Sequence, residues 1–344
     1  LMTEERKTTT GAAKSRARFP WNSEEQREHD RRVFEAELDA FLPDRILDFH
    51  VHVINEGVVP DGQPCDCAGH PIERFDIDDL NAELARIYPG RETRAVCFGF
   101  PRTTYDMARN NAYVAAHGDR ERFFPFRLFD PNEPAPAAVR RNIEEGGFVG
   151  LKPYLSYVDK ADPNDVEVDD MLPGWIMDIA NERGLIVMLH IPRKLRLADP
   201  LNQAQVEKLC IDFPRARIVL AHVGRAYFLK NVVGNLERLK DLPNLWYDLA
   251  MVNHWEVLEY LFRTVSPDRI LYATDAPIAL APGKSVEIND QYTYVTPVPW
   301  DLSISDEHGK LAFTSFVYEE IRAIRKATER LSLPRSFGKG LFFN

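Results

Sequence analysis

The stretch RILDFHVHV, residues 45–53, places two histidines one residue apart inside an otherwise apolar run. Successive side chains of a β-strand point to opposite faces, so His50 and His52 are expected to share one face with Asp48, and the apolar residues to share the other. Imidazole and carboxylate groups are costly to bury without partners. Two imidazoles aimed at one point from a buried strand therefore predict a metal site.

Seven further apolar runs, rich in β-branched residues, follow the first. They are RAVCFGF (94–100), FFPFRLFD (123–130), FVGLKPY (148–154), LIVMLHIP (185–192), RIVLAHVG (217–224), LWYDLAM (245–251) and RILYATDAP (269–277). Each is almost continuously hydrophobic, as expected for parallel strands that are covered on both faces. Stretches long enough for a helix lie between the runs, and eight βα repeats predict an α/β protein with a closed (β/α)8 TIM barrel. The alternative is a doubly wound open sheet, but its typical glycine-rich phosphate turn does not follow the first strand.

Three segments fall outside the regular repeat. Residues 21–41 predict a helix that precedes the barrel, with Asn22 or Ser23 as its cap. Residues 54–75, after the first strand, and residues 278–310, after the eighth, predict long irregular loops. Both loops follow the C-terminal ends of strands, where the active sites of such barrels lie, so they are candidate lids or substrate walls.

Composition narrows the possible partners. The chain has 344 residues, of which 44% are hydrophobic and 28% charged, as in soluble globular proteins. Its net charge of −10 and the lack of a basic patch interleaved with aromatics argue against a nucleic-acid partner. No apolar run is long enough to cross a bilayer and no secretory signal is recognisable, so we expect no membrane association and a cytoplasmic location. The expected organisation is an N-terminal arm and helix, residues 1–44, followed by one barrel, residues 45–344.

Polar residues interrupt the apolar runs at the C-terminal ends of several predicted strands. They are His50 and His52 in the first run, Lys152 in the fourth, His190 in the fifth, His222 in the sixth and Asp275 in the eighth. A lone histidine on a strand is usually a core residue with satisfied hydrogen bonds. A closed barrel, however, would bring all of these side chains to one mouth, and we therefore expect them to form one metal-dependent site.

Four of these stretches together resemble the amidohydrolase superfamily, within it the amidohydrolase-2 branch of hydrolases, lactonases and decarboxylases of the aminocarboxymuconate-semialdehyde type. They are FHVH (49–52), VMLHIP (187–192), VLAHVGRAY (219–227) and DRILYATDAP (268–277). The ligands that the resemblance implies for one divalent metal are His50, His52, His190 and Asp275. It also implies catalytic roles for Asp275 and for His222, the latter as a second-metal ligand or a hydrogen-bonding residue. Three imidazoles and one carboxylate suit Zn²⁺, and the same ligands would accept Mn²⁺, Fe²⁺ or Ni²⁺.

Side chains beside these ligands are candidates for substrate binding. In binuclear relatives a strand-four lysine is carbamylated and bridges two metals, whereas the resemblance favours an unmodified Lys152 and a mononuclear site here. An unmodified Lys152 would offer a cation to a substrate carboxylate. Arg193 and Arg225 each lie three residues after a histidine, and their guanidinium groups suit carboxylate recognition. Tyr154 is a candidate partner for a substrate oxygen. Each of these residues also has an ordinary structural interpretation, as an ion-pair partner or a packed side chain.

Three further features leave alternatives open. Asp248 and His254 follow the seventh strand and would either line the pocket or cap the next helix. In the CDCAGH run, Cys65 and Cys67 are too close for an ordinary zinc knuckle, and no second pair follows, so a separate metal site is not expected. By analogy with other barrels of this type, a homo-oligomer stays open, with the N-terminal arm as an interface element.

The resemblance implies two reactions on a small anionic molecule. The first is hydrolysis of a C–N or C–O bond, in an amide, cyclic amide or lactone, by a metal-activated water. Asp275 would move the proton, and His222 would polarise the carbonyl or hold the water. The second is nonoxidative decarboxylation of an unsaturated or aromatic acid, with Asp275 and the metal controlling protonation at carbon. Hydrolysis is our first interpretation. A barrel that only binds a ligand is disfavoured because every metal position holds a competent residue.

Overall fold

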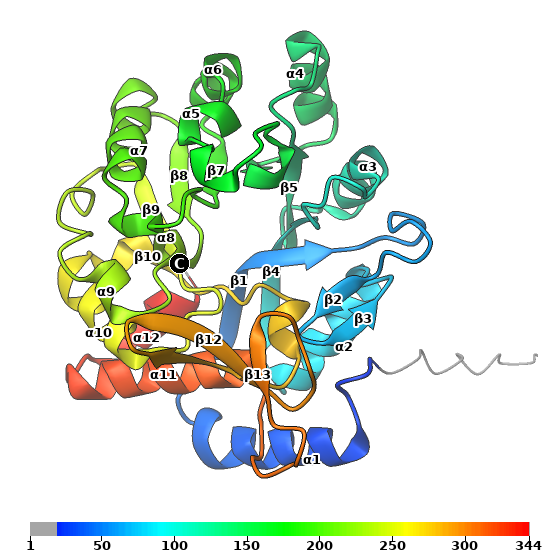
Figure 1. Ribbon diagram of the computed structural model, residues 1–344, viewed down its shortest axis with the longest axis vertical. Helices are drawn as coiled ribbons and strands as arrows, with labels where there is room; N and C mark the ends of the chain where they lie inside the picture. Colours follow the sequence, from blue (N-terminus) through cyan, green and yellow to red (C-terminus); the bar gives the residue numbers. More distant parts are fainter. Residues whose placement is uncertain (1–18, 344) are drawn as a thin grey trace, which may run out of the picture.

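Eight parallel strands form a barrel in this computed structural model, which describes residues 19–343 (Figure 1). The strands pair in chain order and are β1 (Arg45–Val53), β4 (Glu92–Gly99), β5 (Phe123–Phe129), β6 (Gly150–Pro153), β7 (Ile186–Leu189), β8 (Arg217–Leu220), β9 (Leu245–Asp248) and β10 (Ile270–Leu271). The first strand and the segment that follows the last one close the barrel. Phe49 N–H donates to Tyr272 O at 3.0 Å, and His52 N–H donates to Ala276 O at 2.8 Å. The predicted (β/α)8 barrel is confirmed.

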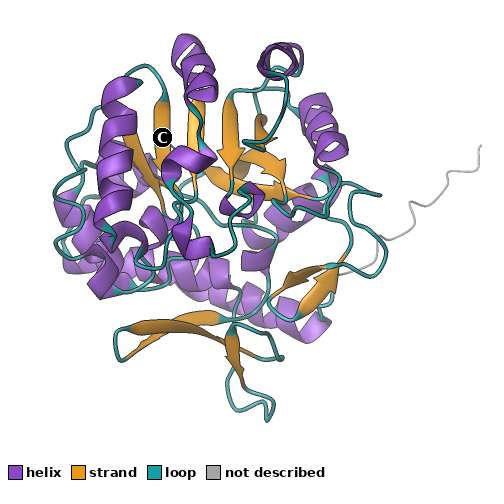
Figure 2. Cartoon of the chain, turned by 45° about the horizontal axis from the view of Figure 1, so that its top comes forward, coloured by secondary structure: helices purple, strands orange, loops and turns teal. Residues whose placement is uncertain are grey.

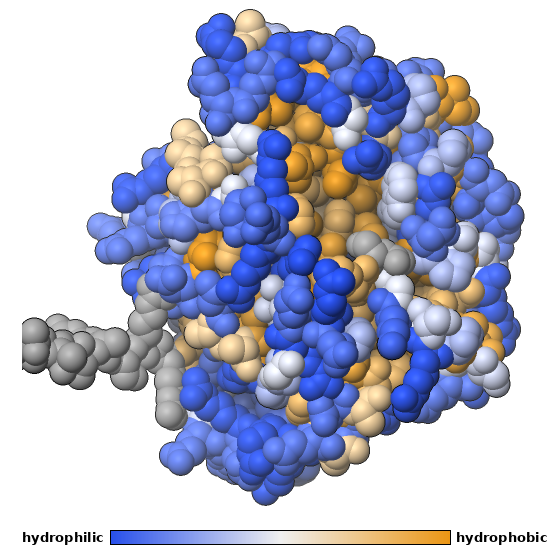
Figure 3. Space-filling view, turned by 180° about the vertical axis from the view of Figure 1, so that it is seen from behind, coloured by the Kyte–Doolittle hydropathy of each residue, from blue (hydrophilic) through white to orange (hydrophobic). Residues whose placement is uncertain are grey.

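Two apolar clusters explain why the strand sequences are almost continuously hydrophobic. The inner cluster, which includes Phe49, Phe98, Phe126 and Met188, consists of residues on the barrel strands or within two residues of their C-terminal ends, so it fills the barrel. The outer cluster packs the other face of the strands against the surrounding helices. Apolar side chains also gather in a hollow on the face seen from behind (Figure 3). The side chains on both faces of each strand are therefore buried, as parallel sheets require.

A register shift in β1 changes the expected alternation of its side chains. The pairing of β1 with β4 shifts between Asp48 and Val51, which indicates a β-bulge. Phe49 and His50 consequently both face the barrel interior, where the Phe49 ring lies 6.0 Å from Phe126 and the His50 ring 5.2 Å from Phe98. Asp48 is left on the outer side. The prediction that Asp48 shares the histidine face is wrong, because an inserted residue breaks the two-residue period.

Helices cover the outside of the barrel (Figures 1 and 2). They are α2 (Ile77–Ile87), α3 (Met107–His117), α4 (Pro136–Glu145), α5 (Val168–Met171), α6 (Gly174–Arg183), α7 (Pro200–Asp212), α10 (Trp255–Thr264), α11 (Phe316–Arg330) and α12 (Arg335–Phe342). The stretch between β8 and β9 is long enough for a full helix, but it contains only the short helix α9 (Leu229–Val232), followed by turns. The chain leaves the helical conformation at Val233, whose ψ is 121°, and Gly234 follows with a left-handed φ of 75°. No helix of the described residues is long and apolar enough to span a membrane.

The expected N-terminal helix is α1 (Glu24–Val33), which continues into a π-helical segment, Phe34–Leu38. Ser23 caps it, because the Ser23 hydroxyl accepts the Gln26 N–H at 3.1 Å. The Gln26 side chain donates to Phe313 O at 2.8 Å and so ties α1 to the segment before α11. Residues 1–18 of the N-terminal arm, whose role as an interface element was left open, lie outside the described residues.

The two long insertions contain short strands that the sequence analysis missed. After β1, a hairpin forms from β2 (Cys65–Cys67) and β3 (His70–Ile72). After β10, a separate sheet forms from β11 (Lys284–Ile288), β12 (Gln291–Thr296) and β13 (Ser303–Ser305), outside the barrel (Figure 2). The expectation of irregular loops is wrong for these segments. β2, β3 and β13 have three residues each, and β11 and β12 carry mainly polar residues and tyrosines instead of the apolar runs that marked the barrel strands.

The two insertions touch each other beside the barrel mouth. Gly69, in the β2–β3 turn, has a φ of 86°, and a Cβ placed on it would lie 2.4 Å from the carbonyl oxygen of Pro299. Only glycine accepts both the left-handed conformation and so close an approach of another backbone. This contact fixes the hairpin against the second insertion.

Candidate metal centre

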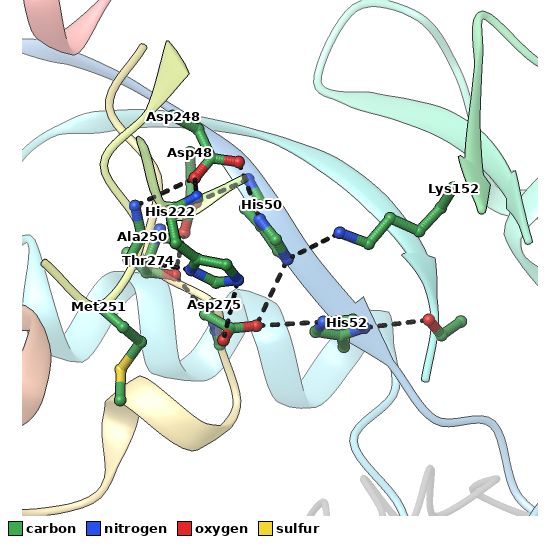
Figure 4. A network of polar contacts seen from close by, with 12 residues as sticks. Asp48, His50, His52, Lys152, His222, Asp248, Ala250, Met251, Thr274 and Asp275 are labelled. Atoms are coloured by element: carbon green, nitrogen blue, oxygen red, sulfur yellow. Dashed lines mark hydrogen bonds and ion pairs between the residues drawn. The ribbon is translucent and has the colours of Figure 1, made fainter. Parts of the chain in front are cut away.

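Three histidines and one aspartate meet at the C-terminal mouth of the barrel (Figure 4). Asp275 Oδ1 lies 3.4 Å from His50 Nε2 and 3.1 Å from His52 Nε2. Asp275 Oδ2 lies 4.0 Å from His222 Nε2. One ligand atom from each of His50, His52 and Asp275 lies within 4.8 Å of the others, which is close enough to hold one metal ion.

Hydrogen bonds fix the orientation of each imidazole ring. His52 Nδ1 lies 3.0 Å from Gly99 O, and His222 Nδ1 lies 2.8 Å from Ala250 O. A carbonyl oxygen only accepts hydrogen bonds, so Nδ1 is the protonated nitrogen in both rings. His50 Nδ1 lies 3.0 Å from the Asp248 carboxylate, which imposes the same tautomer. In this tautomer Nε2 of each ring carries the lone pair that metal ligation requires, and in His50 this nitrogen also faces Lys152 Nζ.

Asp248, at the end of β9, holds two of these histidines from behind. Its Oδ1 accepts the backbone N–H of His222 at 2.7 Å and of Ala250 at 3.2 Å, while its Oδ2 contacts His50. The side chain is completely buried, so it neither lines the pocket nor caps α10. The sequence alternatives for Asp248 are both wrong. His254 stands at the N-cap position of α10 but makes no capping hydrogen bond and does not line the cavity.

Burial sets the protonation of the histidines. It lowers the pKa of His50 well below its usual range, and the Lys152 cation adds to this. It also lowers the pKa of His190, helped by the Arg225 charge, and the pKa of His222. All three rings are neutral near neutral pH, which is the form that binds metals.

Asp275 is a carboxylate in spite of its burial. Burial acts to raise its pKa, and the neighbouring histidines, His50 first and then His52, more than offset this, so the pKa lies well below its usual range. The Asp275 side chain stays 16% exposed and faces the cavity above the histidines.

Lys152 lies beside the histidines rather than on the cavity wall. Its Nζ is 3.4 Å from His50 Nε2 and 5.1 Å from the centre of the Phe98 ring, and the side chain is completely buried. Burial lowers the pKa of Lys152 to about 8, although the charges of Asp248 and Asp275 act in the opposite direction. The structure thus places this cation beside the metal-facing nitrogen of His50, although Lys152 itself is not among the residues that line the cavity.

His190 lies at the same mouth but outside the close group. Its ring centre is 5.3 Å from that of His222 and 4.6 Å from that of Tyr154. Its Nδ1 is buried and has no hydrogen-bond partner among the described residues. Since a buried polar atom without a partner costs free energy, this nitrogen fits a role as a further metal ligand.

A left-handed turn after β8 positions His222 and Arg225. The φ angles of residues 222–225 are 56°, 53°, 67° and 60°. Left-handed backbone costs about 1–2 kcal/mol per non-glycine residue, and only the third of these residues is glycine. Arg225 Nη1 donates to Ile191 O at 3.1 Å, which holds the far end of the turn. Strain of this size at a barrel mouth is typical of functional sites.

A cavity of about 450 Å³ opens above the cluster. The aromatic side chains in its lining are Phe100, Tyr154, Tyr227, Tyr292, Tyr294 and Trp300. Of the predicted substrate-binding residues, Tyr154 and Arg225 line this cavity. Arg193 does not: it pairs with Asp199 at 2.9 Å and donates to Asn164 O. Arg102 also lines the cavity and was missed, because it stands in a loop with no periodic pattern.

Comparisons with known proteins agree with this architecture. A family model described as Amidohydrolase matches residues 48–292. No curated protein matches the chain in sequence. An amidohydrolase from Burkholderia multivorans with bound zinc has a TM-score of 0.54 and 14% identity, over 87% of this chain and 96% of that one. A mutant 5-carboxyvanillate decarboxylase from Novosphingobium aromaticivorans with bound manganese has a TM-score of 0.52 and 14% identity, over 88% and 95%. A probable 2-pyrone-4,6-dicarboxylic acid hydrolase from Acinetobacter baumannii has a TM-score of 0.51 and 11% identity, over 87% and 96%. At these identities the likeness shows the fold.

Proposed function

Because the chain belongs to the amidohydrolase family, whose members are metal-dependent enzymes, we propose that it is a metal-dependent hydrolase. The bond it opens is a C–N or C–O bond of a small anionic amide, cyclic amide or lactone. One observation carries this proposal: the Asp275 carboxylate faces the cavity while lying 3.1 Å from His52 Nε2 and 3.4 Å from His50 Nε2. A proton acceptor and a set of metal-ligating atoms therefore border the same space.

The donor set fits one divalent cation. Two imidazoles with fixed Nδ1 atoms present Nε2 beside a carboxylate oxygen, and His190 adds a buried nitrogen that has no partner among the described residues. Such a set suits Zn²⁺ first and also accepts Mn²⁺, Fe²⁺ or Ni²⁺. A bound cation supplies a Lewis acid that polarises a carbonyl and acidifies water. We favour a single ion, with a second ion bridged by a carbamylated Lys152 as the alternative.

The chain's own residues move the proton and hold the substrate. Asp275 accepts the proton that water loses as its oxygen attacks the carbonyl carbon, and then delivers it to the leaving nitrogen or oxygen. His222 holds that water, because its Nδ1 is committed to Ala250 O and its neutral Nε2 only accepts a hydrogen bond. Arg225 lines the cavity and has no carboxylate partner among the described residues, so it binds the anionic group of the substrate. Tyr154, on the same wall, donates to a substrate oxygen.

Nonoxidative decarboxylation of an unsaturated or aromatic acid is the second candidate. The observation that favours it is the number of aromatic side chains around the cavity, since these suit a planar acid. In this reaction Asp275 delivers a proton to carbon, and no water attacks. Both reactions use the same histidines, so only the products separate them.

The test is a substrate panel assayed with protein loaded with Zn²⁺ or Mn²⁺. Amides, lactones and unsaturated or aromatic acids are incubated, and proton release and CO₂ release are recorded in parallel. We expect proton release with an amide or lactone, and its loss in Asp275→Asn. Asp301→Asn, an exposed carboxylate of the second insertion, is the matched control and should keep full activity. CO₂ release alone would establish the second candidate, and activity that survives in Asp275→Asn would refute both.

A further inference from the structure

Four aromatic rings form a continuous wall of the cavity, here called the aromatic wall: Tyr227, Tyr292, Tyr294 and Trp300. Successive ring centres lie 4.7 Å, 5.6 Å and 5.0 Å apart. Tyr292 and Tyr294 stand on β12 and Trp300 follows it, so three of the four rings come from the insertion after β10. All four line the cavity.

The aromatic wall begins directly beside the candidate metal centre. The Tyr227 ring centre lies 5.6 Å from that of His222. Beside the other edge of the histidine group, the Phe100 ring centre lies 5.1 Å from that of His52. A molecule with its reacting group at the histidines would therefore extend along the aromatic wall.

Arg196 stands behind this wall, in the loop after β7, and connects it to the barrel. Its guanidinium carbon lies 4.6 Å from the Tyr292 ring centre and 5.4 Å from that of Tyr227. Arg196 Nη2 donates to the Tyr292 hydroxyl at 3.2 Å. Arg196 has no carboxylate partner among the described residues and does not line the cavity. Its charge is therefore directed at the two ring faces, which it attracts by a cation–π interaction.

The insertion also has a fixed base. Asn253 Oδ1 accepts the backbone N–H of Ser285 in β11 at 3.0 Å, and Asn253 Nδ2 donates to Phe316 O at the start of α11 at 3.2 Å. This asparagine is buried and bridges the barrel loop, the insertion and the helix. Asn253 thus fastens β11, the neighbour of β12, while Arg196 contacts the Tyr292 ring directly and part of that ring stays exposed.

We propose that the aromatic wall is a ring-recognition subsite, in which Tyr292 contacts a planar conjugated part of the substrate and Arg196 is the positioning residue that holds Tyr292. A flat π system stacks closely on such rings, whereas a saturated ring carries hydrogens above and below its mean plane and stays farther away. The ligand class is thus a planar carboxylate, with its acidic group toward Arg225. The inference rests on the proposed function in one respect, namely that substrate occupies this cavity.

The experiment compares two acids of equal charge and similar size, benzoate and cyclohexanecarboxylate. Each is titrated into the full-length, Zn²⁺-loaded protein, and the dissociation constants are measured by calorimetry and by quenching of tryptophan fluorescence. The variants are Tyr292→Leu, Tyr292→Phe and Arg196→Met. The matched control is Arg269→Met, since Arg269 lies 4.4 Å from the Trp246 ring centre in a similar stack outside the cavity lining. Thermal unfolding shows that each variant is folded.

We expect the wild-type protein to bind benzoate about five-fold more tightly than cyclohexanecarboxylate, the factor that one aromatic stack contributes. Tyr292→Leu and Arg196→Met should bring this ratio close to one, while Tyr292→Phe and Arg269→Met should keep it. A residue that only stabilised the fold would weaken both acids equally and leave the ratio unchanged. Equal binding of the two acids to wild type, no binding of either, or a preference that survives in Tyr292→Leu would each overturn the proposal.

These outcomes are separable from the proposed function. Protein that prefers benzoate but neither binds a metal nor turns over the substrate panel keeps the ring subsite and refutes the hydrolase. Protein that hydrolyses saturated lactones with no preference between the two acids keeps the hydrolase and refutes the ring subsite.

Discussion

Replacing Asp248 with asparagine should lower the metal affinity while leaving the fold almost intact. The asparagine side chain has the same shape, and its oxygen still accepts the N–H groups of His222 and Ala250, which lie 2.7 Å and 3.2 Å from the native Oδ1. Its NH₂ group then faces His50 Nδ1, where the native carboxylate oxygen lies at 3.0 Å. Two donors cannot pair, so the ring is driven to the tautomer with the proton on Nε2, and that nitrogen loses its lone pair.

The expected effect is a loss of about 10- to 100-fold in Zn²⁺ affinity, as for other residues that orient a metal ligand. Asp248→Ala should additionally destabilise the fold, by about 1–3 kcal/mol for each buried N–H group left without a partner. Zn²⁺ affinity is measured by competition with a chelator, and stability by urea unfolding. Asp199→Asn, which changes a buried helix cap away from the cavity, is the control and should keep the wild-type affinity. An unchanged Zn²⁺ affinity in Asp248→Asn would refute the tautomer argument.

Three further predictions use the same protein. Metal analysis of the wild-type protein after Zn²⁺ loading should give one ion per chain. Two ions per chain in the wild type, both absent from Lys152→Met, would instead establish the bridged, binuclear site. Gly69→Ala should lower the free energy of unfolding by about 1–3 kcal/mol, because alanine is strained at this φ and its Cβ collides with a backbone carbonyl of the second insertion. Gly62→Ala is the control, since Gly62 has a similar φ but open space around it. Equal losses of stability for the two variants in urea unfolding would contradict the collision. Once a substrate is identified, Arg225→Met should raise the KM for that substrate by about 10-fold or more, which is the value of one charged hydrogen bond. Arg193→Met should change this KM less than about two-fold. Steady-state kinetics that show the reverse order would place the anionic group of the substrate outside the cavity.

The barrel strands could be predicted because the same pattern, a run of apolar residues, recurs along the chain. Parallel strands that are buried on both faces must be apolar along their whole length, so each strand could be recognised in the sequence without information on tertiary contacts. The histidine and aspartate positions followed because the C-terminal ends of barrel strands share one rim. His50, His52, His222 and Asp275 meet there as expected, and His190 lies at the same rim in contact with His222.

The features that escaped prediction depend on contacts between segments distant in sequence. Arg193 and Arg225 have identical spacing from a histidine, yet only Arg225 lines the cavity. The difference arises because residues 222–225 form a left-handed turn that the Ile191 carbonyl secures, whereas Arg193 is drawn outward by Asp199. The spacing of an arginine from a histidine in the sequence does not reveal the Ile191 carbonyl or the Asp199 carboxylate as partners. The same holds for Asp248, whose partners include His50 on β1 and the backbone of His222 after β8, both distant from it in sequence.

The bulge in β1 shows how barrel closure and the metal centre depend on the same residues. By turning Asp48 outward, it lets the Asp48 carboxylate accept the N–H and hydroxyl of Thr274 at 2.9 Å and 2.6 Å. The next residue, Asp275, donates its N–H to His50 O at 2.9 Å. The segment formed by Thr274 and Asp275 is therefore bonded to β1 at Asp48 and at His50. The separation of the His50 and Asp275 side chains is consequently set by hydrogen bonds across the seam of the barrel. A site anchored in this way can accommodate different insertions around its rim, such as the aromatic wall, without changing the geometry of the metal-ligating atoms.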